Sequence, residues 1–198
     1  MLQYFKPLLL AGLLVASTGL SAQETTPTPE TAAPATSDLD MGTVIDEENA
    51  VGTPYIRETF GDWSLRCLRA EKGQDDPCQL YQLLNDADGN SVAEISMFPL
   101  PEGGRAAAGA TIVVPLETLL TEQLQISVDG SAARRYPFTF CNRAGCVSRV
   151  GFTQDEIDQF KQGNKATLRM VPAAAPEEEV VLDISLIGFT AGFNGSEN

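Results

Sequence analysis

The stretch that decides the fold of this chain is Tyr136-Pro137-Phe138-Thr139-Phe140-Cys141-Asn142-Arg143-Ala144-Gly145-Cys146. Its two cysteines flank Asn-Arg-Ala-Gly, and this tetrapeptide favours a turn because Asn and Gly tolerate the backbone angles of tight turns. Strand-forming residues precede the turn from 135 to 141 and follow it from 146 to 152. The pattern therefore predicts a β-hairpin with one cysteine on each strand.

The whole chain has four cysteines and no histidine. In an oxidising compartment an even number of cysteines indicates disulfides, and four cysteines allow three pairings. We favour the local pairs Cys67–Cys78 and Cys141–Cys146, because each pair flanks turn-forming residues. A zinc site would need tighter spacing, often with histidine, so no metal is predicted. The lack of histidine also removes the commonest general base, and with it the Ser-His-Asp and Cys-His arrangements.

The N-terminus reads as a secretory signal peptide over residues 1–22. Lys6 precedes an apolar run from 8 to 16, and small residues at 21 and 22 suit cleavage after Ala22. The alternative is an uncleaved membrane anchor, but the apolar run is about half of the ~20 residues that a spanning helix needs. We therefore expect a periplasmic, outer-membrane-associated or secreted protein with no transmembrane segment after cleavage.

Residues 23–54 are rich in Thr, Pro, Ala and acidic side chains and contain no Lys or Arg. Such a segment has little apolar surface to bury, which predicts a disordered acidic linker. The remaining residues, 55–198, are expected to form one β domain. The formal net charge of the chain is −14, which argues against nucleic acid and anionic membrane surfaces as partners.

Short runs with period-2 alternation or β-branched residues divide the domain into strands separated by turn signals. The sequence predicts strands at 60–67, 78–84, 91–98, 108–114, 123–128, 135–141, 146–152, 165–171 and 180–187. Residues 115–122 are ambiguous between helix and loop. The predicted fold class is all-β, an antiparallel β-sandwich or barrel-like domain with one short helix at about 153–162. The helix is expected because Thr153 and Glu156 form a capping box and Gly163 follows.

Candidate catalytic residues are absent from the pattern, and no cofactor is predicted. Asp75-Asp76 and Glu177-Glu178-Glu179 are adjacent carboxylates, which in loops are normally solvated. The acidic stretch 86–90 faintly resembles the start of a calcium loop but is more typical of a hairpin turn, since the later bidentate acid is missing. The Cys-x4-Cys spacing between strands favours a structural disulfide over thiol exchange.

Arg134, Arg135 and Arg143, with Arg149 nearby, form the only local cluster of positive charge in this part of the acidic sequence. Arginine recognises carboxylate, phosphate and sugar-acid groups through its planar fork of donors. The alternative is that these arginines pair with the domain's own acids. We carry Arg134, Arg135 and Arg143 forward as candidate ligand-binding residues, and we expect Trp63, Phe138 and Phe140 to belong to the core.

Five segments occur in an order that resembles a known family: 60–67 (FGDWSLRC), 77–80 (PCQL), 126–130 (ISVDG), 136–146 and 186–191 (LIGFTA). Over about 59–193 the chain is similar to the invasion-associated locus B family of secreted alphaproteobacterial proteins. The resemblance implies an exported β-rich protein, linked in pathogenic relatives to host-cell entry, and it brings no catalytic residues.

The sequence thus favours a non-enzymatic binding or interaction domain of the cell envelope. Its partner would be an envelope or host-surface protein or glycan, and its oligomeric state stays open. The alternatives are an envelope hydrolase or thiol-redox accessory enzyme, and a purely structural envelope protein.

Overall fold

The computed structural model of the chain describes residues 40–44 and 49–196. The predicted signal peptide and most of the predicted linker lie outside the described residues. The chain divides into two units, Met1–Thr43 and Val44–Asn198, and the second unit holds every strand and helix reported below. In the described part, no helix is both long enough and apolar enough to cross a membrane.

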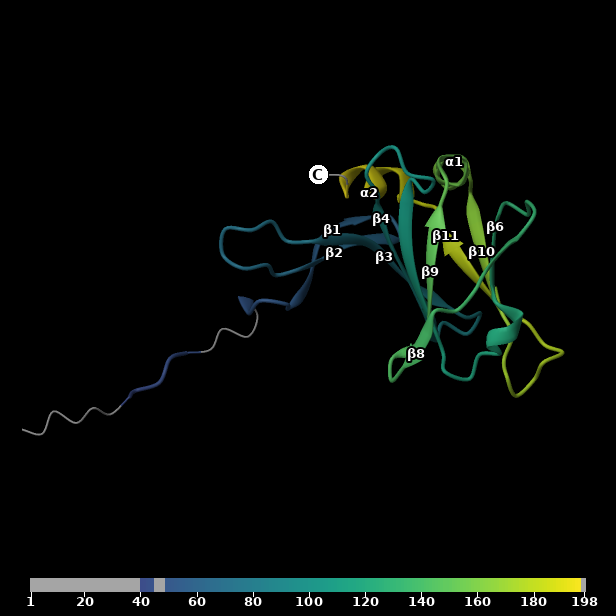
Figure 1. Cartoon of the computed structure of the whole chain (residues 1–198), viewed down its shortest axis with the longest axis horizontal. Helices are drawn as coiled ribbons and strands as arrows, with labels where there is room; N and C mark the ends of the chain where they lie inside the picture. Colours follow the sequence, from purple (N-terminus) through teal and green to yellow (C-terminus); the bar gives the residue numbers. More distant parts are fainter. Residues whose placement is uncertain (1–39, 45–48, 197–198) are drawn as a thin grey trace, which may run out of the picture. The chain divides into compact units, whose positions relative to one another are not determined.

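Antiparallel strands arranged in two sheets make up most of the domain, with two short helices at one end (Figure 1). One sheet has seven strands in the order β1-β2-β3-β4-β5-β9-β8, and the other has four in the order β11-β10-β6-β7. The elements are β1 (Pro54–Phe60), β2 (Trp63–Leu68), β3 (Cys78–Asn85), β4 (Ser91–Pro99), β5 (Ala108–Val114), the 3-10 helix η2 (Leu120–Glu122), β6 (Leu124–Val128), β7 (Arg134–Tyr136), β8 (Phe140–Asn142), β9 (Gly145–Phe152), α1 (Gln154–Gln162), β10 (Lys165–Met170), β11 (Val180–Ser185) and α2 (Phe189–Gly195). The predicted mostly-β antiparallel fold is confirmed.

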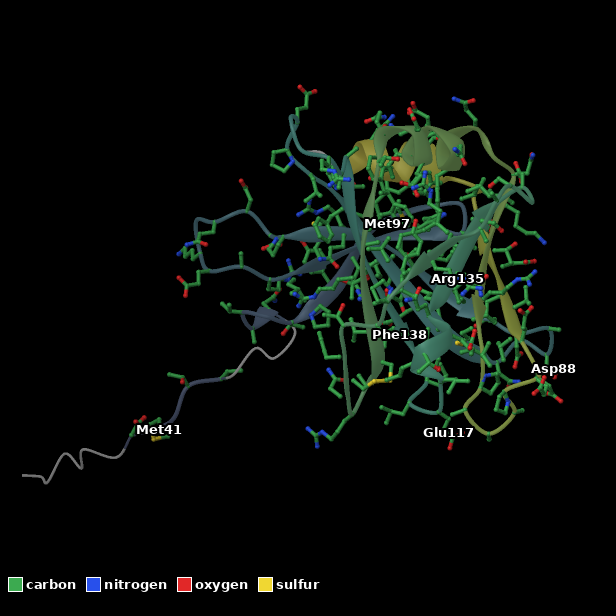
Figure 2. The ribbon with its side chains drawn as sticks, turned by 45° about the vertical axis from the view of Figure 1, so that its right-hand side comes forward. Met41, Asp88, Met97, Glu117, Arg135 and Phe138 are labelled. Carbon is green, nitrogen blue, oxygen red and sulfur yellow. A yellow bond between two sulfur atoms is a disulfide. The ribbon has the colours of Figure 1, made fainter. Side chains whose placement is uncertain are left out.

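Strand alternation places one face of each sheet in a shared core. Along β2, for example, Trp63, Leu65 and Cys67 are buried while the residues between them lie on the opposite face. Figure 2 shows Met97 of β4 at the centre of the molecule, in agreement with its complete burial. One hydrophobic cluster joins buried side chains of both sheets and both helices. The other face of the seven-stranded sheet is turned away from this cluster.

The predicted strand at 60–67 is wrong in its extent, because the chain reverses within it. β1 ends at Phe60 and β2 begins at Trp63, and the two strands pair as an antiparallel hairpin. The turn depends on Gly61, which has a φ of 56° and passes so close to Ile187 that a Cβ would lie 2.6 Å from its carbonyl oxygen. The Gly-Asp pair inside the alternating run was the available signal for this turn.

The predicted single strand at 135–141 is also wrong, because the chain changes sheets inside it. β7 pairs with β6 in the four-stranded sheet, and β8 pairs with β9 in the seven-stranded sheet. Between them lies Pro137, which has no N–H for a ladder and donates nothing to either sheet. Its carbonyl instead accepts a hydrogen bond from the Ser148 hydroxyl at 3.0 Å. The predicted hairpin around the Asn-Arg-Ala-Gly turn survives as the shorter β8–β9 pair.

The helix predicted at 153–162 is confirmed as α1, including its reciprocal capping box between Thr153 and Glu156. A second helix, α2, was not predicted. Its sequence, FTAGFNG, is rich in residues with low helix propensity, so it draws its stability from packing. Phe189 and Phe193, four residues apart on one face, are both buried.

An aromatic chain ties the two helices to both sheets. The Phe189 ring centroid lies 5.3 Å from those of Trp63 and Phe160, and Phe160 continues to Phe152 at 5.2 Å and Phe152 to Tyr136 at 5.9 Å. Each pair has an edge or tilted geometry, the arrangement that aromatic quadrupoles favour. The chain fixes the helix end of the domain, where a pocket described below is found.

Candidate functional site

The structure does not bring the three candidate arginines to one surface. Arg134 and Arg135 are neighbours on β7, so their side chains leave opposite faces of the four-stranded sheet. Arg135 is exposed and is labelled in Figure 2, whereas Arg143 is exposed in the turn between β8 and β9 of the other sheet. Their role in ligand binding therefore stays a prediction for Arg135 and Arg143 as separate residues.

Arg134 pairs with an acid of the domain itself. Its Nε lies 3.0 Å from Oε1 of Glu156, a carboxylate in the first turn of α1 that is only 7% exposed. The same carboxylate accepts hydrogen bonds from the Tyr136 hydroxyl at 2.9 Å and from the Thr153 amide at 2.8 Å and hydroxyl at 2.7 Å. These contacts join β7 to α1 and use the acceptor positions of the carboxylate.

The partners of Glu156 decide its protonation. Burial raises its pKa, but the hydrogen bonds from Thr153 and Tyr136 and the charge of Arg134 outweigh burial, so the pKa of Glu156 lies below its ordinary value. Burial, together with the hydrogen bond to Glu156 and its charge, raises the pKa of Tyr136. Glu156 is therefore ionised and Tyr136 is neutral at physiological pH, and both serve the packing of α1.

Both disulfides link cysteines that face each other directly across antiparallel strands. Cys67 of β2 pairs with Cys78 of β3, and Cys141 of β8 pairs with Cys146 of β9. These are the local pairs that the sequence favours, and no free cysteine is present in the described part of the chain. Each bond closes a hairpin, so both cysteine pairs have a structural place in the fold.

Two of the five family motifs, residues 60–67 and 186–191, lie close together where β11 packs beside β2 and β3. The indole of Trp63 donates to the Ser185 carbonyl at 2.7 Å, and the buried Gln82 accepts from the Ser185 amide at 2.9 Å. The Ser185 hydroxyl donates to Asp62 at 2.6 Å. Gly188, with a φ of 86°, passes Phe60 so closely that a Cβ would overlap its carbonyl oxygen. These contacts between the two motifs and their neighbours Gln82 and Ser185 therefore hold the two sheets together and do not form an open site.

A broad surface suitable for contact with a partner is the face of the seven-stranded sheet turned away from the core, here called the exposed sheet face. Four large apolar side chains on it are 42 to 51% exposed: Ile56, Leu68, Leu83 and Phe140. The expectation that Phe140 belongs to the core is therefore wrong. Between these four side chains lie polar and aromatic side chains that strand alternation places on the same face, namely Ser64, Arg66, Gln79, Tyr81, Glu94, Ser96, Phe98, Thr111 and Arg149. The apolar groups are therefore spread over the face and alternate with polar and aromatic side chains, a mixed composition that protein interfaces share.

Arg66 connects side chains of β2, β3 and β4 on the exposed sheet face. Its guanidinium lies 3.9 Å from the centroid of the Tyr81 ring and 3.3 Å from the Ser96 hydroxyl, to which it donates. The Tyr81 hydroxyl donates to Glu94 at 3.1 Å, and burial, with the neighbouring Glu94 charge, raises the pKa of Tyr81. A second stack places Arg149 5.7 Å from the Phe140 ring centroid. Sequence reasoning missed these contacts because the residues that make them come from five different strands.

Beside this group the exposed sheet face is hollowed by a shallow cavity of about 540 Å³, lined by Pro54, Arg66, Leu68, Pro77, Cys78, Gln79 and Phe98. Its walls are mostly apolar, with one guanidinium and one amide for orientation. That composition is usual for sites that bind another molecule.

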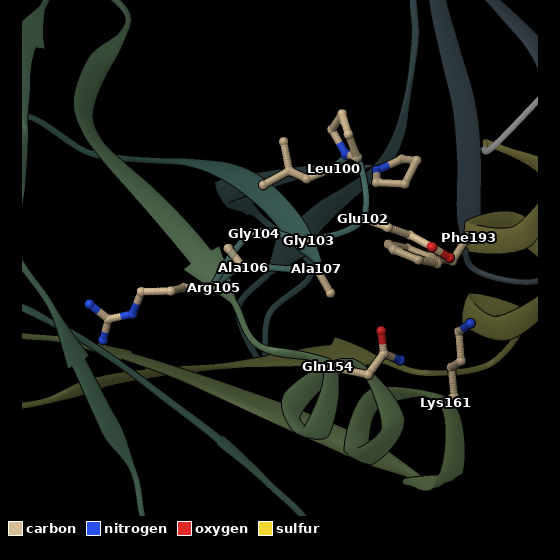
Figure 3. A pocket seen from close by; sticks show the side chains of 12 residues that line it. Leu100, Glu102, Gly103, Gly104, Arg105, Ala106, Ala107, Gln154, Lys161 and Phe193 are labelled. Carbon is tan, nitrogen blue, oxygen red and sulfur yellow. The ribbon is translucent and has the colours of Figure 1, made fainter.

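A second cavity, of about 410 Å³, lies at the helix end of the domain (Figure 3). The loop between β4 and β5, from Pro99 to Ala107, forms one wall, and Gln154 and Lys161 of α1 with Phe193 of α2 form the other. The loop that joins β4 to β5 therefore lines a pocket. Nothing in the sequence placed this loop against α1 and α2.

Local structure explains two of the acidic candidates, Asp86 and Asp76. Asp86 accepts hydrogen bonds from the amides of Asp88 and Asn90 at 3.0 and 2.8 Å, so its carboxylate closes the β3–β4 turn, at whose tip Asp88 stands (Figure 2). Asp76 accepts from the Tyr55 hydroxyl and the Ala70 amide. Within the described ranges, no three His, Cys, Asp or Glu side chains come together as metal ligands would.

Comparison with known proteins places these features in a family. The family model described as "Invasion associated locus B (IalB) protein" matches residues 63–197. The crystal structure of invasion associated protein B from Bartonella henselae superposes with a TM-score of 0.59 and 23% sequence identity. The match covers 71% of this chain and 94% of that one, so the two proteins share a fold. No curated protein matches the chain.

Proposed function

The chain belongs to the invasion-associated locus B family, and we propose that its domain acts outside the cytoplasm as a non-enzymatic binding domain of the cell envelope. Its partner is an envelope or host-surface protein or glycan, and the exposed sheet face is the surface that engages it. The family's description links it to invasion. We extend the proposal to invasion only where the bound partner is a host-surface molecule.

Two disulfides support a site of action outside the cytoplasm. One disulfide closes the β2–β3 hairpin and the other closes the β8–β9 hairpin. Disulfides persist in oxidising compartments such as the periplasm and the cell surface. The signal peptide expected over residues 1–22 agrees with this location. The domain is proposed to be non-enzymatic because Glu156, the buried acid of the described part, is occupied by Arg134, Tyr136 and Thr153.

The observation that carries the binding role is the exposed sheet face itself. Its aliphatic side chains are distributed over several strands, and the arginine stacks supply orienting polar groups between them. A broad surface of this composition, with aromatic and Arg residues among the apolar ones, is typical of protein interfaces. Within the partner classes named above, it therefore favours a protein over a glycan.

Capture of a partner from envelope extract tests the proposal. The protein serves as the bait, and each variant of it changes one exposed apolar residue. Leu83→Glu changes the exposed sheet face, whereas Val181→Glu makes the same kind of change on β11 of the other sheet, at a nearly equal exposure of 48% against 46%. The Leu83 variant is expected to lose the captured partner and the Val181 variant to keep it. Protease treatment of the extract should abolish capture; survival of capture would identify a glycan instead.

Equal capture by the two variants would overturn the assignment of this face. The candidate arginines are tested separately, with Arg135→Gln and Arg143→Gln as single variants, because they lie in different sheets. Loss of capture in either one, with capture by the Leu83 variant intact, would move the contact surface to that arginine.

A further inference from the structure

Three charged side chains line the cavity at the helix end, and two of them, of opposite sign, stand on opposite walls. Glu102 belongs to the β4–β5 loop and Lys161 to α1, and both line the cavity together with the Phe193 ring. Figure 3 shows Glu102 and Lys161 reaching toward Phe193 from the loop and from the helix. Among the described residues, neither charge takes part in an ion pair. The cavity therefore separates an acid and a base that do not neutralise each other.

Neighbouring residues of α2 hold the Lys161 side chain in place, but its ammonium keeps at least one free N–H donor. Its ammonium donates to the neutral Asn194 amide oxygen at 3.0 Å and lies 5.1 Å from the Phe193 ring centroid. An ammonium has three N–H donors, so at least one stays available to an acceptor in the cavity. Gln154, two turns before Lys161 on the same helix face, adds an amide to this wall.

The other wall is shaped by the loop backbone. Gly103 has a φ of 93°, a conformation that suits glycine, and it turns the chain so that the loop arches beside the helices. Pro99 and Pro101 restrict the loop's backbone, and with Phe193 they line the cavity with apolar surface. The cavity therefore combines this apolar surface with a larger share of polar groups, and its 410 Å³ lies in the usual size range of small-molecule sites.

We propose that this cavity binds a small zwitterion of the peptide type, with its carboxylate at Lys161, its ammonium at Glu102 and a short apolar body over Phe193. A ligand with both charges satisfies both walls at once, whereas a simple anion meets the carboxylate of Glu102 and a simple cation meets Lys161. None of the residues that define the exposed sheet face lines this cavity, so the site is additional to the proposed partner surface.

Titration calorimetry of the exported protein with the dipeptide alanyl-alanine tests this site. We expect saturable binding that N-acetylation or C-amidation of the dipeptide weakens at least about tenfold, since each removes one charge-assisted contact. Glu102→Gln and Lys161→Gln should weaken binding of the free dipeptide similarly. Lys72→Gln is the matched control, because it removes the same charge as Lys161→Gln at an exposed position that does not line the cavity.

Three results would each overturn the proposal. The first is no binding of alanyl-alanine up to about 10 mM by protein whose circular dichroism shows it folded. The second is equal binding of the free and doubly capped dipeptides, and the third is equal binding by wild type and both charge variants. Partner capture through Leu83 is measured separately, so failure of one site leaves the result for the other intact.

Discussion

Replacing the buried carboxylate of α1 by an amide, Glu156→Gln, tests how the helix is held to the four-stranded sheet. The amide keeps the size of the side chain and one acceptor oxygen. It loses the negative charge that faces Arg134, and it places an NH₂ group where donors from Tyr136 and Thr153 converge. Three of the four contacts around this group, at 2.7 to 2.9 Å, are hydrogen bonds from neutral donors to the ionised oxygens.

A hydrogen bond to a charged group contributes about 1.5–3 kcal/mol to stability. A buried donor or acceptor left without a hydrogen-bond partner costs a similar amount. Because the amide retains part of the network, we expect Glu156→Gln to lower the free energy of unfolding by about 2–3 kcal/mol. For a domain of this size that corresponds to a fall of about 5–10 °C in Tm. Arg134→Gln should cost at most about 1 kcal/mol, since the Arg134 side chain is 61% exposed.

Urea denaturation followed by tryptophan fluorescence measures both variants, because Trp63 is completely buried. Asp155→Asn is the control: it removes the same charge from the same helical turn at an exposed position. A depressed pKa means that the contribution of Glu156 is present above the ordinary pKa of 4.5 and is lost as the pH falls through its lower folded-state value. The difference between wild type and Glu156→Gln should therefore shrink below about pH 4.5.

The reasoning would be refuted if Glu156→Gln and Asp155→Asn had equal effects at pH 7. It would also be refuted if Arg134→Gln cost as much as Glu156→Gln. That second result would mean that the ion pair, and not the set of neutral donors, holds the helix.

Three other substitutions test the packing of the domain by thermal unfolding. Gly188→Ala places a side chain on a left-handed backbone against the β1 carbonyl and should cost at least about 2 kcal/mol of stability. Gly73→Ala should cost clearly less, because its side chain meets only open space. Equal costs would contradict the close approach of Gly188 to β1. Phe189→Ala should cost about 3–5 kcal/mol because α2 depends on its burial, and a loss below 1 kcal/mol would show that the helix is held otherwise. Replacing Cys141 and Cys146 together by Ser should cost about 2 kcal/mol through the lost loop constraint, with β8 opening first in hydrogen exchange; unchanged protection of β8 would count against this.

The sequence was informative where local rules coincide with tertiary packing. α1 could be predicted because Thr153 and Glu156 satisfy the backbone donors of its first turn within four residues. The disulfide pairs followed from turn residues between the cysteines. By contrast, α2 has weak local propensity and forms because Phe189 and Phe193 fill the core, and no local pattern reports such burial. The 135–141 run reads as one strand because its residues suit strands in either sheet.

The candidate sites depend on contacts that sequence order hides. Clustered arginines could be identified, but alternation sends Arg134 and Arg135 to opposite faces, and the partner of Arg134 lies on α1. Arg66 and Tyr81 are fifteen positions apart in the sequence and touch only because β2 and β3 pair in one register. Glu102 and Lys161 likewise share a cavity only after the β4–β5 loop meets α1.

Site-specific photo-crosslinking in the exporting cell tests the central claim, that this domain engages a partner through the exposed sheet face. A photoreactive amino acid is placed at Leu83 of that face or, as the matched position, at Val181 of the other sheet. A discrete crosslinked protein product from Leu83, with none from Val181, is the result we predict. Crosslinks from Val181 with none from Leu83, or none from either position in folded and exported protein, would contradict the claim.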